Sequence, residues 1–132
     1  MNLLLDTHTF LWFAIASLGG NLPEPTRELL EERSNRLYLS CVSPWEAAIK
    51  ISIGKLQLPQ PIRQIVQTEI RDNGLILLDI KLAHLDLIER LPFHHKDPFD
   101  RLLIAQAQIE GFVIVSVDAA FDAYAANRLW LT

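Results

Sequence analysis

Two acidic residues follow short apolar segments, a position at which parallel-sheet proteins commonly bind ligands. Asp6 comes straight after Leu3–Leu5 at the start of the chain. Asp118 comes after Phe112–Ser116, with one residue between. Apolar runs of this length are typical of buried strands, and the carboxyl ends of parallel strands form one edge of a sheet, where ligands bind. We therefore predict that the two carboxylates lie at the same edge.

Two further acids, Glu46 and Asp100, occur in similar segments, SPWE at 43–46 and DPFD at 97–100. Each segment is typical of a helix start, with a capping residue, a proline at the first helical position and an acid two residues later. Ser43 is thus predicted to cap one helix, in a capping box with Glu46, and Asp97 to cap the other and support the site. The helix dipole favours a first-turn carboxylate by about 0.3–1 kcal/mol, so capping and catalysis are compatible.

Brought together at one edge, the four acids would raise one another's pKa values, and a divalent cation removes this conflict. A ligand set made only of oxygen favours Mg²⁺ or Mn²⁺ over zinc. Such a site suits hydrolysis of phosphodiester bonds, in which one carboxylate also orients or deprotonates the attacking water. Asp6 and Asp100 are the expected metal ligands, with Glu46 and Asp118 completing the catalytic set. Taken singly, each acid is also explained as part of a helix cap.

Polar neighbours of the acids are expected to support the site. The hydroxyls of Thr7 and Ser116 are placed to hold carboxylates, although a local backbone hydrogen bond is the simpler interpretation for Thr7. The HHK segment at 94–96 is predicted to line the rim and to meet phosphate, with a solvated turn as the alternative. Four basic residues are candidates for contact with a nucleic acid, with ordinary surface charge as the alternative: Lys50, Lys55, Lys96 and Arg101.

Strand and helix patterns alternate along the chain. The predicted strands are Leu3–Leu5, Arg36–Cys41, Leu75–Leu78, Phe112–Ser116 and an edge strand at Leu129–Leu131. The predicted helices run from Thr7 to Ser17 before Gly19-Gly20, from Pro23 onward, from Ser43 to Gly54, from Pro61 to Asn73, around Leu82–Ile88, from Asp97 to Gly111 and from Ala119 to Ala126. This alternation predicts a parallel sheet covered by helices on both faces.

Length and charge limit the class of protein. The chain has 132 residues, enough for one domain over residues 1–132. Its net charge of −4, from 16 acids and 12 basic residues, is unlike that of most nucleic-acid binders, but without the four site acids the rest is neutral. The single cysteine excludes an internal disulfide and fits the cytoplasm. Asp6 and His8 interrupt the first apolar run, so we expect neither a signal peptide nor a membrane span.

Four segments together resemble the PIN-domain family, and within it the VapC-like toxin branch. They are LLLDTHTFLWF, SPWEAAIKISIGKL, HHKDPFDRLLIAQA and SVDAAF, which occur in the family's order and extend over nearly the whole chain. The third segment is the most specific. Asp6 matches the family's first metal ligand, Glu46 the acid of its second motif, Asp100 a metal ligand before the long helix, and Asp118 the fourth acid, whose role varies most.

The resemblance carries expectations about fold and activity. It implies a three-layer α/β/α sandwich around a mostly parallel sheet of four to five strands. It also implies a Mg²⁺- or Mn²⁺-dependent endoribonuclease that acts on RNA as the toxin of a toxin–antitoxin pair, is inhibited by a small cognate antitoxin and forms a homodimer.

Two other classes of function compare with this one: phosphoryl transfer by a different α/β protein, and binding without catalysis. A phosphatase of the haloacid-dehalogenase type needs two aspartates flanking one residue after the first strand, and Asp6-Thr7-His8 supplies one. A response-regulator receiver needs a lysine late in the chain, and none follows Lys96. A PIN-like module that binds RNA or protein without catalysis is the main alternative. Loss of a core acid would be its mark, and all four are present.

Overall fold

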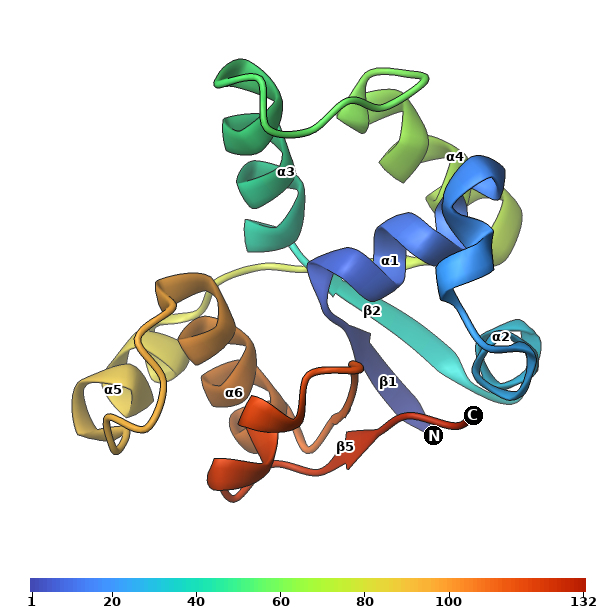
Figure 1. Ribbon diagram of the computed structural model, residues 1–132. Coiled ribbons are helices and arrows are strands. Elements are labelled where there is room, and N and C mark those ends of the chain that lie inside the picture. The colour runs from blue at the N-terminus through green and yellow to red at the C-terminus, as the bar shows by residue number, and fades with distance from the viewer.

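The computed structural model describes all 132 residues and contains one five-stranded sheet in the order β3-β2-β1-β4-β5 (Figure 1). Every neighbouring pair of strands is parallel. The strands are β1 (Asn2–Leu5), β2 (Arg36–Ser40), β3 (Ile76–Leu78), β4 (Val113–Val115) and β5 (Arg128–Leu129). The predicted parallel sheet of four to five strands is therefore confirmed, with β1 at its centre.

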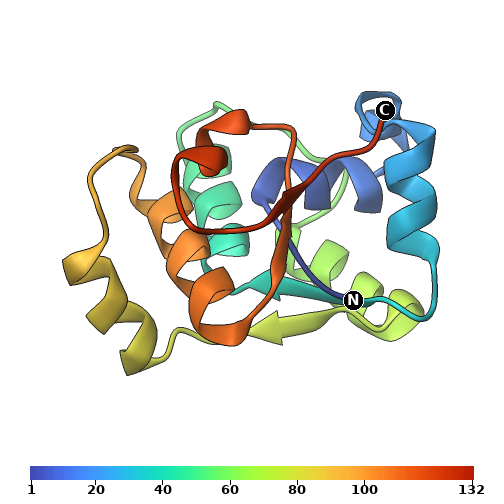
Figure 2. The ribbon, with the colours of Figure 1, turned by 90° about the horizontal axis from the view of Figure 1, so that it is seen from below.

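Helices cover both faces of the sheet, as Figures 1 and 2 show. The α-helices are α1 (Thr7–Ala14), α2 (Glu24–Glu31), α3 (Val42–Ser52), α4 (Ile62–Asn73), α5 (Leu82–Arg90) and α6 (Pro98–Glu110), joined by the 3₁₀ helices η1 (Ala16–Asn21) and η2 (Ala119–Ala123). One core cluster joins the sheet to α1, α2 and α4, and a second joins it to α5 and α6. This is the expected three-layer sandwich. None of its helices is long and apolar enough to cross a membrane.

The central strand explains why the first apolar run is uninterrupted. Leu3 and Leu5 belong to one core cluster and Leu4 to the other. All three side chains are fully buried, because successive side chains of a strand point to opposite faces and both faces are covered. The strand therefore delivers the next residue, Asp6, to the carboxyl edge at the middle of the sheet.

Chain connections diverge at this strand. The chain moves from β1 to β2 and β3 on one side, and β4 and β5 lie on the other. Such a reversal leaves a crevice at the carboxyl ends of the two central strands, where open α/β sheets bind their ligands. Asp6 follows β1, and Ser116 follows β4, so both flank this crevice.

The start of α3 differs from the prediction. The helix begins at Val42, with Cys41 already in helical conformation, and Ser43 forms no capping box. The Ser43 hydroxyl is buried and has no hydrogen-bond partner. Ser40, the last residue of β2, instead accepts a hydrogen bond from the Val42 N–H, at 3.3 Å. The strand thus leads directly into the helix, and Glu46 lies beyond its first turn.

Other element ends also shift. The first helix stops at Ala14 rather than Ser17, because Ile15 takes an extended conformation and its side chain enters the core. Gly19 and Gly20 then fall inside η1 rather than after the helix. The last predicted helix is the shorter η2, and the last strand is β5, which ends at Leu129.

Arg101, predicted to contact a nucleic acid, is buried instead. Its guanidinium lies 4.3 Å from the centroid of the Phe93 ring and 3.4 Å from the Tyr124 hydroxyl. It also donates to the backbone carbonyls of Ile88, Leu91, Pro92 and His95. The surface role is therefore wrong, since a planar group with five donors is used here to fix the loop between α5 and α6.

Replacing this guanidinium should destabilise the domain. We expect Arg101→Ala to lower the free energy of unfolding by about 2–4 kcal/mol, because several buried carbonyls lose their donor. Arg63→Ala is the matched control, since Arg63 is exposed on α4, and it should change stability by less than about 0.5 kcal/mol. Urea denaturation followed by circular dichroism measures both. Equal midpoints for the two variants would contradict the structural role of Arg101.

Candidate active site at the carboxyl edge of the sheet

The structure brings all four predicted acids together in one cleft of about 230 Å³ at the carboxyl edge of the sheet. A fifth acid, Asp97, also lines this cleft. The lining residues are Asp6, Thr7, His8, Glu46, Lys50, His95, Asp97, Asp100, Val117 and Asp118. Five carboxylates thus face one lysine and two histidines.

Asp6 is held at both of its carboxylate oxygens. Its Oδ1 accepts a hydrogen bond from the Thr9 N–H at 2.9 Å and caps α1. Its Oδ2 accepts one from the Ser116 hydroxyl at 2.5 Å. The side chain is buried. Asp6 is therefore both a helix cap and a fixed wall of the cleft, so the two interpretations of this residue are compatible.

Ser116 links the ends of the two central strands. Its hydroxyl donates a hydrogen bond to Asp6, which follows β1. The same oxygen accepts a hydrogen bond from the Asp118 N–H at 3.0 Å. Asp118 in turn caps η2 through the Ala120 N–H at 2.9 Å, and its side chain remains exposed. The serine therefore sets the spacing between the acid of β1 and the acid that follows β4.

Glu46 reaches the cleft from α3 and is buried. Its Oε1 accepts a hydrogen bond from the Thr7 hydroxyl at 2.7 Å. Its Oε2 lies 3.0 Å from Lys50 Nζ, one turn further along the helix. Thr7 thus holds a carboxylate rather than making the local backbone bond that we considered simpler. These two contacts orient Glu46 in place of the expected capping box.

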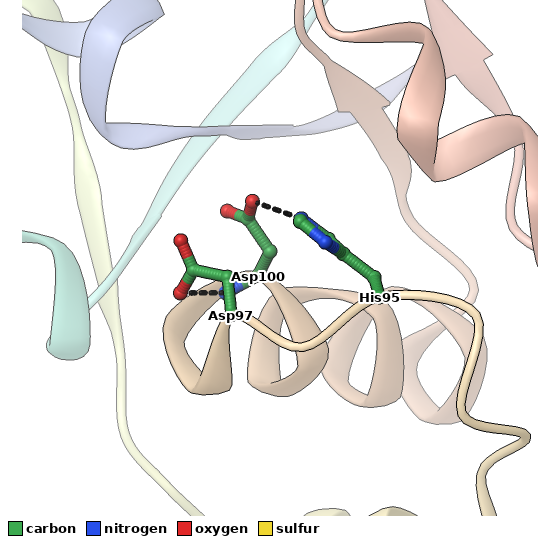
Figure 3. A group of neighbouring side chains, drawn as sticks. All are labelled: His95, Asp97 and Asp100. Atoms are coloured by element: carbon green, nitrogen blue, oxygen red, sulfur yellow. Dashed lines mark hydrogen bonds and ion pairs between the residues drawn. The ribbon is translucent and has the colours of Figure 1, made fainter.

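Asp97 and Asp100 stand at the start of α6, where the prediction of the helix cap is confirmed. Asp97 Oδ1 accepts hydrogen bonds from the N–H groups of Phe99 and Asp100, at 2.9 and 3.4 Å. Asp100 lies in the first turn, with its Oδ2 2.8 Å from His95 Nε2. Figure 3 shows the three side chains on the same side of this turn, with the ring of His95 pointing toward Asp100.

Burial raises the pKa of the Asp100 carboxyl from its usual 3.8 to about 6. The hydrogen bond from His95 opposes this rise, and the negative charges of Asp97 and Asp6 add to it. One pKa unit corresponds to 1.36 kcal/mol between the two protonation states. An ionised Asp100 is therefore costly unless a positive charge comes close to it.

The donor set fits a divalent cation. One ligand atom each from His95, Asp97 and Asp100 lies within 4.8 Å of the other two. Asp97 Oδ2 accepts no hydrogen bond from the protein, since the capping bonds use Oδ1. Carboxylate oxygens are the preferred ligands of Mg²⁺ and similar hard cations, and a cation here would offset the mutual repulsion of the five acids.

The predicted basic residues lie in different places. Lys50 lines the cleft. Lys55, just beyond α3, and Lys96, in the loop before α6, are exposed and do not line it. The contact of His95 with Asp100 was not predicted, because the HHK segment was interpreted as part of the rim. The position of His95 two residues before the helix cap Asp97 could have indicated this contact.

Comparisons with known proteins agree on a family. A family model described as the PIN domain matches residues 3–127. Ribonuclease VapC16 of Mycobacterium tuberculosis is 33% identical over 67 residues, which are 51% of this chain and 48% of that relative. The chain thus aligns with about half the length of this curated relative.

Two solved structures with a similar fold are described as VapBC bound to DNA. VapBC2 from Rickettsia felis, bound to a DNA fragment from its promoter, matches with a TM-score of 0.69 and 16% identity, over 98% of this chain and 99% of that one. DNA-bound VapBC from Salmonella typhimurium matches with a TM-score of 0.69 and 17% identity, over 98% and 97%. At such identities the likeness concerns the fold.

The raised pKa of Asp100 predicts a pH-dependent effect on stability. In EDTA, Asp100→Asn should raise the free energy of unfolding at pH 7.5, by about 1–3 kcal/mol, because it removes a costly buried charge. The folded-state pKa of about 6 exceeds the usual 3.8, so the wild-type protein regains stability as the pH falls between these values. The gain should accordingly shrink below pH 6 and vanish under about pH 4.

Thermal and urea unfolding at several pH values measure this difference. Asp86→Asn, on the exposed surface of α5, is the matched control and should show no comparable gain. A gain for Asp100→Asn that is the same at every pH would contradict the assignment.

Proposed function

The chain belongs to the PIN-domain family, and on this premise we propose that it is a divalent-metal-dependent endoribonuclease, which hydrolyses phosphodiester bonds within RNA. The observation that supports this most is the convergence of acids from four separate segments on one cleft. The cleft lies at the crevice between β1 and β4, where ligand sites of such sheets occur. The partial match to a ribonuclease adds to it.

We propose Mg²⁺ or Mn²⁺ as the cofactor, held by Asp6 and Asp100. The chemistry that such an ion supplies is activation of a water molecule and compensation of the charge on the phosphate. Ser116 and the Thr9 N–H fix the carboxylate of Asp6 beforehand. Little rearrangement of this side chain is then needed on binding, which favours a preorganised site.

Glu46 is the proposed residue for handling the water proton. Thr7 contacts one oxygen of this carboxylate and Lys50 contacts the other, so the carboxylate keeps one orientation in the cleft. A carboxylate within hydrogen-bond reach of a water can orient it or accept its proton. Asp118 is the most exposed of the four acids, and it completes the negative wall on the side of β4.

Lysines supply the proposed contacts with the RNA backbone. Lys50 lies in the cleft, where its ammonium can leave the ion pair with Glu46 and bind a phosphate oxygen instead. Lys55 and Lys96 are exposed and would bind phosphates further along the strand. With a net charge of −4 over the whole chain, RNA binding would depend on these local contacts rather than on a general attraction.

We further propose that the protein is the toxin of a toxin–antitoxin pair, neutralised by a small antitoxin, and that it forms a homodimer in the cytoplasm. The two solved structures reported above support the first part, since their descriptions name VapBC. The homodimer follows from the family resemblance of the four sequence motifs, and the cytoplasmic location from the single cysteine.

Cleavage of total RNA tests the proposed activity. The wild-type protein should cleave RNA with Mg²⁺ or Mn²⁺ and lose this activity in EDTA. Asp6→Asn and Asp100→Asn should each reduce the rate by at least about 100-fold, because each removes a charged metal ligand. Asp86→Asn is the matched control, because Asp86 is exposed on α5 and does not line the cleft, and it should keep the wild-type rate.

Two results would contradict the proposal. Cleavage that continues in EDTA or in Asp6→Asn would exclude this mechanism. A folded protein that binds the metal but cleaves no RNA would favour the alternative of a PIN-like binding module. Circular dichroism of each variant shows whether a lost activity reflects a lost fold.

A further inference from the structure

His95 stands closer to the acids of α6 than a rim residue would. Its Nε2 lies 2.8 Å from Asp100 Oδ2, and the side chain is half-buried. Ligand atoms of His95, Asp97 and Asp100 lie within 4.8 Å of one another. All three belong to the short stretch that forms the start of α6, and Figure 3 shows the Asp100 carboxylate between the Asp97 carboxylate and the His95 ring.

The backbone of His95 is held from two sides. Its N–H donates to the Tyr124 hydroxyl at 2.8 Å, and its carbonyl accepts from Arg101 at 3.4 Å. The N–H of His94 donates to the same hydroxyl at 3.0 Å. Tyr124 and Arg101 are both buried. These contacts fix the backbone position of His95, as expected for a residue whose side chain binds a ligand with defined geometry.

Spacing of the donors is compatible with one shared ion. Ligand atoms about 2.0–2.2 Å from one ion lie at most about 4.4 Å from each other. The three atoms here lie within 4.8 Å of one another, with 2.8 Å between His95 Nε2 and Asp100 Oδ2, so a small inward movement of the side chains brings them onto one ion. Asp97 has one oxygen, Oδ2, that its capping bonds leave free for an ion. Because Asp6, Glu46 and Asp118 line the same cleft, one imidazole contact cannot offset all the negative charge beside Asp100.

We propose that His95 Nε2 is a direct ligand of the divalent ion, together with one oxygen each of Asp97 and Asp100, and that this nitrogen makes the site prefer Mn²⁺ to Mg²⁺. The inference rests on the proposed function, since it names a further ligand and the ion preference of the same site. Imidazole is a poor ligand for Mg²⁺ and a good one for transition metals, whereas carboxylates accept both.

A different role for the same contact is the main competitor. His95 would then donate its Nε2 proton to Asp100 and orient that carboxylate without touching the ion, as outer residues of metal sites commonly do. Both roles weaken metal binding when the ring is removed. Only a direct ligand places a nitrogen nucleus on the ion, so a spectroscopic measurement separates them.

Pulsed electron paramagnetic resonance of the full chain loaded with Mn²⁺ is the test. The wild-type spectrum should show modulation from a directly bound ¹⁴N nucleus, and His95→Gln should abolish it. Two matched controls, His8→Gln within the cleft and His94→Gln beside it, should keep the modulation. Its absence from the wild type, its loss in His8→Gln, or its survival in His95→Gln would each overturn the proposal.

Ion affinities supply the second readout. His95→Gln should weaken Mn²⁺ binding by about tenfold or more and Mg²⁺ binding by less than about threefold, measured by calorimetry. An equal loss for both ions would overturn the preference. RNA cleavage is assayed separately: nitrogen modulation without cleavage would remove the proposed activity and leave this ligand, and cleavage without modulation would do the reverse.

Discussion

The carboxylates at the carboxyl edge of the sheet repel one another, and the contacts around them offset part of this repulsion. Five of them share one cleft with a single lysine. Asp6 is compensated by a serine hydroxyl and a backbone N–H, Glu46 by Thr7 and Lys50, and Asp100 by His95. The pKa of Asp100 is nevertheless raised, chiefly by burial and further by the negative charges of Asp97 and Asp6. A divalent cation would provide the missing charge, so the folded chain keeps an unfavourable local arrangement that binding relieves.

The fold gathers the acids by simple means. A central strand buried on both faces ends at Asp6, and the neighbouring β4 ends next to Ser116, whose hydroxyl joins the two strand ends. The start of α6 carries Asp97 and Asp100, and the buried Arg101 ties the preceding loop to it. Stability and function use the same contacts here, because the residues that cap helices and close loops also orient the acids.

Local signals in the sequence predicted the strands, the Asp97 cap and the helix end at Gly111, whose φ of 74° suits glycine. They also placed the acids at strand and helix ends, from which the sheet order brings them together. Contacts between distant segments were beyond such signals. Thr7 meets Glu46 only because α1 and α3 pack together, and Arg101 looks like any surface arginine in the sequence. Ser43 is not a cap because α3 already begins at Val42.

Anomalous diffraction from crystals soaked in Mn²⁺ tests the central claim most directly, namely that these acids form one cation site. The account predicts a strong peak in the cleft at roughly 2.0–2.6 Å from an oxygen of Asp100 and from one of Asp6 or Asp97, which disappears in crystals of Asp100→Asn. A peak only elsewhere on the surface, or none at Mn²⁺ concentrations that support RNA cleavage, would contradict it.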